Sequence, residues 1–284
     1  MAVAQSSTDQ PGSSWIPAAS FTSLFGMFRH VSAGAFSGLI TGIVVGGFGG
    51  RVFMRIAGAA AGDRAQGSFT EAGFIVGEVT VGGTIALMLF IGIFVGVAAS
   101  LFYLIFQPWL SWAGRFRGVV YGVMLFAIGS ATSDMMNPDN IDFLILGNGG
   151  LLVALLFGLF VLFGVVQDAL FRLADRTMPG EEEGWQNIGV LYVIIFMVGV
   201  VAGLPLIAGL FNPEGLCDCE PPWVANIGVF VAFLGTAMMW IVALRKGSRQ
   251  MYVVAAIVGY GGTIVALAGG LARAVSDARA IITF

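Results

Sequence analysis

Long apolar runs, separated by short polar stretches, dominate the pattern along this chain. Seven runs contain no charged residue, and six of them reach the roughly 17 to 25 residues that a helix needs to cross a bilayer. The third run is shorter, so Arg117 and Asp134 at its ends would have to extend toward the membrane surface. The runs are Val31–Gly50, Val79–Phe106, Gly118–Ser133, Phe143–Gln167, Ile188–Phe211, Trp223–Leu244 and Gln250–Ala272. The pattern predicts an all-α polytopic membrane protein with about seven transmembrane helices.

The N-terminal region divides into two parts before the first run. Residues 1–14 are polar and lack the Lys and Arg of a signal peptide, so we expect a disordered tail. Residues 15–30 carry aromatic and aliphatic side chains at mostly helical spacing, which predicts a short amphipathic helix in the membrane interface. Residues 31–284 are then expected to form a single transmembrane domain.

Charged residues make up only 10% of the chain, and they lie outside the apolar runs. On the predicted seven-span topology, Lys and Arg are more frequent on the side that holds the N-terminus. That side carries Arg29, Arg115, Arg117, Arg172, Arg176, Arg245, Lys246 and Arg249, and the other carries Arg51, Arg55, Arg64, Arg273 and Arg279. Because cytoplasmic loops are enriched in these residues, we expect a cytoplasmic N-terminus, an outer C-terminus and a cell membrane location. Acidic residues are most frequent on the outer side.

Glycine is frequent, with 42 residues, and five of these glycines are spaced four apart in the first run. They are Gly34, Gly38, Gly42, Gly46 and Gly50. This spacing places them on one helix face, as in a glycine zipper, where another backbone can approach closely. Packing within one protomer is the favoured interpretation. Packing between protomers and a wet pore lined by small residues are the alternatives.

Two arginines follow this strip at a helical spacing of four. Arg51 and Arg55 therefore share a helix face close to hydrocarbon, where charged groups usually find a partner. Glu78 immediately precedes the second run. We predict an ion-pair cluster of Arg51 and Arg55 with Glu78 that links the first two helices. The alternative is that both guanidinium groups extend to the outer headgroups.

Two outer loops hold candidate metal ligands. Asp134, Asp139 and Asp142 gather oxygen ligands that a hard cation could use, although Asn and Asp in such a loop first indicate a turn. Cys217 and Cys219 lie in the second loop, and their spacing does not suit a normal disulfide with each other. An interchain disulfide, a soft metal and free thiols remain open for them. The metal interpretation is weak at both places.

The end of the fourth run carries four charges at spacings of three and four. Asp168, Arg172, Asp175 and Arg176 are expected to form a solvated helix end whose charges pair with one another.

The chain offers few residues for catalysis. His30 is its only histidine, which excludes haem held by two histidines of one protomer. Lys246, its only lysine, lies in a predicted loop and not inside a helix, so a retinal Schiff base is excluded. No HExxH or nucleotide-binding motif occurs, and no predicted span has a charged residue in its middle. An enzyme is the least expected class, with no cofactor and no nucleic acid partner.

Two classes of function remain. We favour a structural or accessory subunit that associates through Gly-rich helix faces, with the lipid bilayer and a second copy or another membrane protein as partners. The alternative is a conduit or transporter for a small solute or cation, with an acidic outer vestibule. Pro205, inside the fifth run, could mark a kink beside such a path.

Overall fold

The computed structural model describes residues 16–17, 21–68, 81–180, 188–211 and 223–283, without the side chains at 64, 91–93, 134, 200 and 202–211. These residues form helices and no strands, which confirms the all-α class. In this part of the chain, four helices are long and apolar enough to cross a membrane. They are Leu24–Ala61, Gly149–Thr177, Trp223–Leu244 and Arg249–Thr283. A helical membrane protein is therefore consistent with the fold, and the described parts of the seven apolar runs are helical except at Ser133, Gly147 and Asn148.

The first helix is continuous over three segments. They are α1 (Leu24–Thr41), the wider π-helical η1 (Gly42–Gly49) and α2 (Gly50–Ala61). Ser23 caps its start, because its side-chain oxygen accepts a hydrogen bond from the Gly26 N–H at 3.1 Å. The helix ends at Gly62, whose positive φ of 63° suits glycine.

The second apolar run also forms one continuous helix, which then turns sharply. It consists of α3 (Val81–Leu87), the π-helical η3 (Met88–Val95) and α4 (Gly96–Phe106). The 3₁₀ segment η4 (Gln107–Phe116) follows, with Pro108 near its start and a kink at Gly114, where φ is 51°. This kink redirects the chain into α5 (Arg117–Thr132).

The remaining elements include the longest helices. The short 3₁₀ turn η2 (Gly62–Arg64) follows α2. The elements after α5 are η5 (Asp134–Met136), α6 (Ile141–Leu146), α7 (Gly149–Thr177), α8 (Val190–Phe211), α9 (Trp223–Leu244) and α10 (Arg249–Thr283). Lys246 adopts a left-handed conformation in the short turn that joins α9 to α10.

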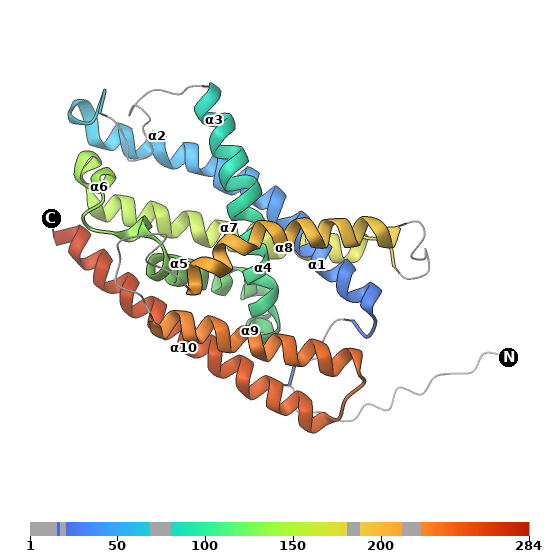
Figure 1. Ribbon diagram of the computed structural model, residues 1–284. Helices are drawn as coiled ribbons and strands as arrows, with labels where there is room; N and C mark the ends of the chain where they lie inside the picture. The colour runs from blue at the N-terminus through green and yellow to red at the C-terminus, as the bar shows by residue number, and fades with distance from the viewer. Residues whose placement is uncertain (1–15, 18–20, 69–80, 181–187, 212–222, 284) are drawn as a thin grey trace.

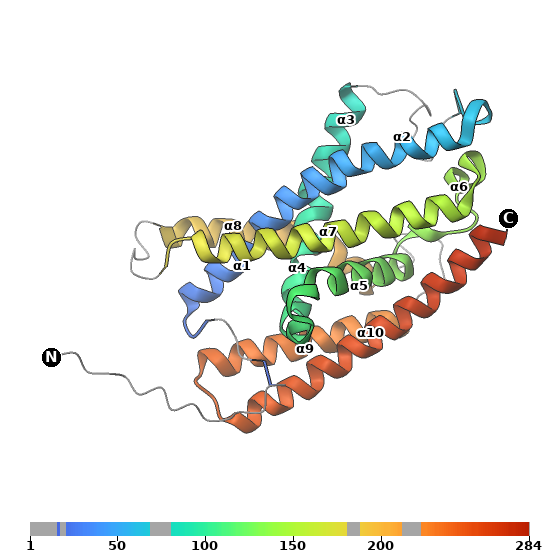
Figure 2. The ribbon, with the colours of Figure 1, turned by 180° about the vertical axis from the view of Figure 1, so that it is seen from behind.

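The helices lie in a consistent order across the bundle. Figures 1 and 2 show α9 and α10 as an antiparallel pair along one side, with the long α1–α2 helix on the other side and α5 and α7 between them. Direct contacts join α1 to α7, α7 to α5 and α5 to α10. Helix α4 crosses this row obliquely, and α8 packs against α1 and α4.

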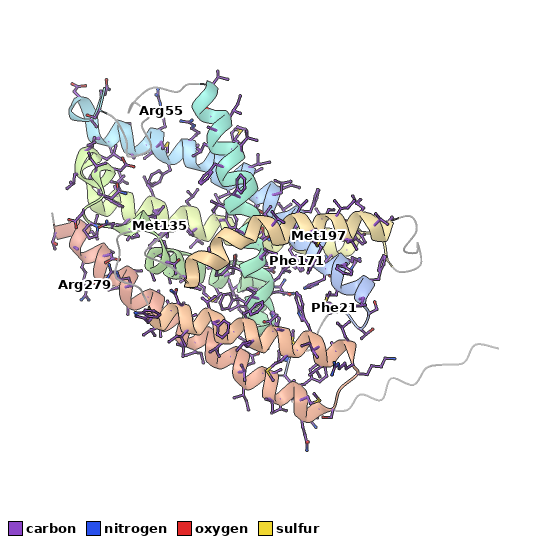
Figure 3. All side chains as sticks on the ribbon, viewed as in Figure 1. Phe21, Arg55, Met135, Phe171, Met197 and Arg279 are labelled. Carbon is purple, nitrogen blue, oxygen red and sulfur yellow. The ribbon has the colours of Figure 1, made fainter. Side chains whose placement is uncertain are left out.

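The interior of the bundle contains several large aromatic side chains, and its exterior is rich in apolar ones. Tyr103, Trp109, Tyr121 and Phe171 are among the fully buried side chains of the main core. Figure 3 shows Phe171 inside the bundle, whereas Arg55 and Arg279 lie at its edge. Large apolar side chains are exposed on all the long helices. An exterior of this kind is suited to lipid rather than water.

The glycine strip of the first helix faces the α3–α4 segment of the same chain. A Cβ atom added at Gly38 would lie 2.5 Å from the carbonyl oxygen of Gly96, and one added at Gly34 would lie 2.9 Å from Cγ of Leu104. Gly96 in turn lies against Gly42. Gly46 and Gly50 are also buried. These contacts bring two backbones together within one chain.

Several predicted boundaries differ from those observed. No break separates residues 24–30 from the first span, because α1 runs through His30 into the apolar run. The fourth run is divided, because Gly147 and Asn148 both have positive φ and end α6 before α7 begins. Helix α10 continues past Ala272 to Thr283. The expected tail at 1–14 lies outside the described residues.

We expect Gly38→Ala to lower the free energy of unfolding by about 1–3 kcal/mol, because the added methyl group would press on the α4 backbone. Gly158→Ala is the matched control, since nothing lies within 4 Å of a Cβ atom added there. Alanine is also the better helix former, so the control should not destabilise. Thermal unfolding in detergent, followed by circular dichroism, measures both variants. Equal losses would contradict this account of the glycine strip.

Candidate functional site

A buried carboxylate, Asp168 of α7, joins three helices. Its Oδ1 accepts hydrogen bonds from the Tyr103 hydroxyl of α4 at 2.5 Å and from Nε of Arg117, at the start of α5, at 2.6 Å. Its Oδ2 lies 2.7 Å from Nη2 of Arg172, one turn further along α7. The Asp168 side chain is only 1% exposed. Such a buried charge requires partners, and here it has three.

Glycines bring α5 close enough to α7 for these contacts. A Cβ atom added at Gly118 would lie 2.8 Å from the Gly164 carbonyl oxygen and 3.0 Å from Cβ of Asp168. One added at Gly122 would lie 2.5 Å from the Phe160 carbonyl oxygen. Residues with larger side chains would separate the helices. The first turn of α5, which carries Arg117, therefore lies directly over Asp168.

Aromatic rings enclose the carboxylate on its inner side. Tyr103 packs edge-on against Tyr121, with ring centres 5.0 Å apart, and its ring is tilted against that of Phe171, with centres 5.3 Å apart. The guanidinium carbon of Arg117 lies 5.7 Å from the centre of the Tyr103 ring. The Tyr121 hydroxyl donates to the carbonyl oxygen of Ala99. Such surroundings exclude water and strengthen the ionic contacts.

A second polar contact joins α7 to α1 beside this cluster. Gln167 is fully buried, and its Nε2 donates to Oγ of Ser37 at 2.9 Å. Ser37 donates to the Gly34 carbonyl oxygen at 2.8 Å. Oε1 of Gln167 has no hydrogen-bond partner among the described residues. It is one of three buried side-chain nitrogen or oxygen atoms in the described part of the chain that have no hydrogen-bond partner.

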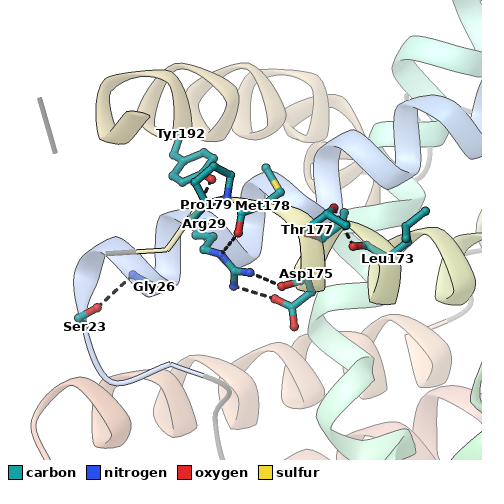
Figure 4. Close-up of polar contacts among 10 residues, drawn as sticks. Ser23, Gly26, Arg29, Leu173, Asp175, Thr177, Met178, Pro179 and Tyr192 are labelled. Carbon is teal, nitrogen blue, oxygen red and sulfur yellow. Dashed lines mark hydrogen bonds and ion pairs between the residues drawn. The ribbon is translucent and has the colours of Figure 1, made fainter. Parts of the chain in front are cut away.

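The end of α7 is held by Arg29 of α1. Figure 4 shows its guanidinium group at the side chain and the backbone of Asp175 and at the backbone of Met178. Nη1 lies 3.1 Å from Oδ1 of Asp175, Nη2 donates to the Asp175 carbonyl oxygen, and Nε donates to the Met178 carbonyl oxygen at 3.2 Å. The Tyr192 hydroxyl of α8 donates to the Pro179 carbonyl oxygen at 3.1 Å. These bonds satisfy carbonyl groups at and beyond the helix end.

These contacts correct the expectation of a solvated, self-paired helix end. Asp168 does pair with Arg172, but it is buried and its other partners come from α4 and α5. Asp175 pairs with Arg29 of α1. The helix spacing of three and four indicated pairing within α7, whereas most of the contacts of Asp168 and Asp175 join α7 to other helices.

The predicted pairing of Arg51 and Arg55 with Glu78 stays a prediction, because Glu78 lies outside the described residues. Arg55 is exposed. Nε of Arg51 is buried and has no hydrogen-bond partner in the described part of the chain.

The acidic loop forms local turns where it is described. The Asp139 N–H donates to Oδ1 of Asn137 at 3.0 Å, and the Asp142 N–H donates to Oδ1 of Asn140 at 2.8 Å, which starts α6. Among the described side chains, no three His, Cys, Asp or Glu residues gather as metal ligands would. The Asp134 side chain, Cys217 and Cys219 are not described.

The Asp168 cluster fixes two guanidinium groups at one place. Both carboxylate oxygens are already bonded, so the arrangement presents Arg117 and Arg172 rather than a free carboxylate. Sequence reasoning missed Tyr103 and Arg117 as partners of Asp168. The available signals were the glycines of α5 and the position of Asp168 at the end of an apolar run, and neither identifies the partner helix.

Comparison of the chain with family models, with curated proteins and with solved structures finds no match in any of the three.

We expect Asp168→Asn to cost about 3–5 kcal/mol of unfolding free energy, because two guanidinium groups then lose their shared carboxylate. Asp139→Asn is the control, since Asp139 is exposed and its substitution should change stability by less than about 0.5 kcal/mol. Thermal or urea unfolding in detergent compares the two variants. Indistinguishable stabilities would show that the cluster does not hold the bundle together.

Proposed function

We propose that this chain is a multi-pass membrane protein that acts as a structural or accessory subunit rather than as an enzyme. The observation that carries the proposal is the contrast between its interior and its exterior. The buried Asp168 is engaged by Tyr103 and Arg117 of neighbouring helices, while large apolar side chains cover the outside. The interior polar groups thus serve helix packing, and the outer surface suits lipid and partner helices.

The proposal includes seven membrane crossings. The helices assigned to them are α1–α2, α3–α4, α5, α7, α8, α9 and α10. Helix α5 is short, with 16 residues, but it packs between α7 and α10. The bias of Lys and Arg in the connections supports a cytoplasmic N-terminus and an outer C-terminus. Tags at the two ends should then differ in protease accessibility in sealed vesicles.

Association with a partner would use outward-facing residues. The strip from Gly34 to Gly50 supports packing inside the chain, because its contacts go to Gly96, Leu104 and other residues of the same molecule. A second copy of the chain or another membrane protein would instead contact the exposed apolar side chains of the outer helices.

The second candidate function is a conduit for a small solute or cation. The observation that favours it is Gln167, whose buried Oε1 lacks a partner among the described residues beside Ser37. An unsatisfied acceptor of this kind suits water or a polar solute. The acidic outer loops could raise the local concentration of cations.

Copurification from native membranes in mild detergent, followed by mass spectrometry, tests the proposal. We expect a second copy or another membrane protein to be recovered at a fixed ratio to the chain. The matched control is the same preparation in a dissociating detergent, which should release the partner. Recovery of the chain alone, together with solute flux after reconstitution into vesicles, would contradict the subunit proposal and favour the conduit.

A further inference from the structure

The Asp168 cluster carries more positive than negative charge. One carboxylate contacts two guanidinium groups, those of Arg117 and Arg172. The neighbouring carboxylate, Asp175, pairs with Arg29 instead. Among the described residues, no other carboxylate lies within ion-pair distance of Arg117 or Arg172. One positive charge at this place therefore has no protein counter-charge in the described part of the chain.

Both arginines keep hydrogen-bond donors for a further group. Arg117 contacts Asp168 through Nε, and Arg172 does so through Nη2. Each guanidinium has five N–H donors, and the structure gives the remaining ones no partner among the described residues. The Arg172 side chain is 43% exposed and that of Arg117 is 15% exposed. Asp168 thus holds two guanidinium groups on one carboxylate, and the Arg172 group is accessible, an arrangement suited to phosphate.

The neighbouring segment η4 carries the aromatic residues typical of a membrane interface. Trp109 anchors it, because this ring is buried and its Nε1 donates to Oγ1 of Thr236 at 2.9 Å. Trp112 and Phe116 are exposed, and the Arg115 guanidinium carbon lies 4.8 Å from the centre of the Phe116 ring. Exposed Trp and Arg residues are typical of headgroup depth in membrane proteins.

We propose that Arg117 and Arg172 bind the phosphate of an anionic phospholipid headgroup, where η4 leads into α5 beside α7. A lipid, and not a soluble phosphate compound, is the indicated source, because exposed aromatic residues and an apolar exterior adjoin the two arginines. The phosphate would supply the missing counter-charge. This inference rests on the proposed membrane insertion, although it requires no protein partner.

Native mass spectrometry of the full chain in a neutral detergent tests the inference. Phosphatidylglycerol and phosphatidylcholine are added separately, and the retained lipid is counted for each. We expect phosphatidylglycerol to be retained preferentially by the wild type. Arg172→Gln should weaken its retention about fivefold, which corresponds to roughly 1 kcal/mol for one arginine at a membrane surface.

Arg279→Gln is the matched control, because it removes the same charge from the far end of α10 (Figure 3). It should retain phosphatidylglycerol as the wild type does. Equal retention by the Arg172→Gln and Arg279→Gln variants, or equal retention of the two lipids by the wild type, would overturn the inference. Displacement of the lipid by soluble glycerol phosphate would overturn the assignment to a lipid.

Two further readouts keep the outcomes distinct. Circular dichroism shows whether the Arg172→Gln variant is folded, and Arg172→Lys is a second variant that keeps the charge while losing the forked geometry. We expect the lysine variant to retain more lipid than the glutamine variant, and the reverse order would contradict the inference. Recovery of the chain in the membrane fraction is scored separately. Its loss would refute the proposed function, whereas lipid binding can fail in a chain that is fully inserted.

Discussion

The contact of α5 with α7 at Gly118, Gly122 and Gly164 is the constraint on which the centre of this bundle depends. It places Arg117 against Asp168, and the Tyr103 hydroxyl reaches the same carboxylate from α4. An ion pair between exposed groups would contribute little to stability. Here the carboxylate is buried beside aromatic rings. Removing one member of the ion pair would therefore leave the other charge buried without compensation, which is strongly destabilising.

The same principle of close backbone approach recurs elsewhere in the fold. Gly38 and Gly96 join the first helix to α4, and Gly235 and Gly259 join α9 to α10. In a lipid bilayer the hydrophobic effect does not drive helices together, because the lipid tails are as apolar as the side chains. Close packing of this kind and a few polar contacts would then hold the helices together. At these positions glycine thus serves contact between helices rather than flexibility.

The sequence was sufficient to predict the apolar helices and insufficient to predict how they meet. Hydropathy located the four helices that are long and apolar enough to cross a membrane, because such a helix is apolar along most of its length. It did not detect the break at Gly147 and Asn148, where both residues have positive φ, because the single polar residue Asn148 has little effect on the mean hydropathy of so long an apolar run. Nor could spacing along α7 reveal that Arg117 is a partner of Asp168, because the two residues are distant in sequence and meet only through the crossing of α5 and α7.

We infer that the contact between Arg117 and Asp168 couples α5 to α7. A double-mutant cycle with Arg117→Gln and Asp168→Asn, measured as unfolding free energy in detergent, tests this coupling. We predict a coupling energy of about 2 kcal/mol for this pair. Arg117→Gln combined with Asp277→Asn should be additive within about 0.5 kcal/mol, because Asp277 pairs with Arg273 and shares no partner with Arg117. Additivity of Arg117→Gln with Asp168→Asn would contradict the claim.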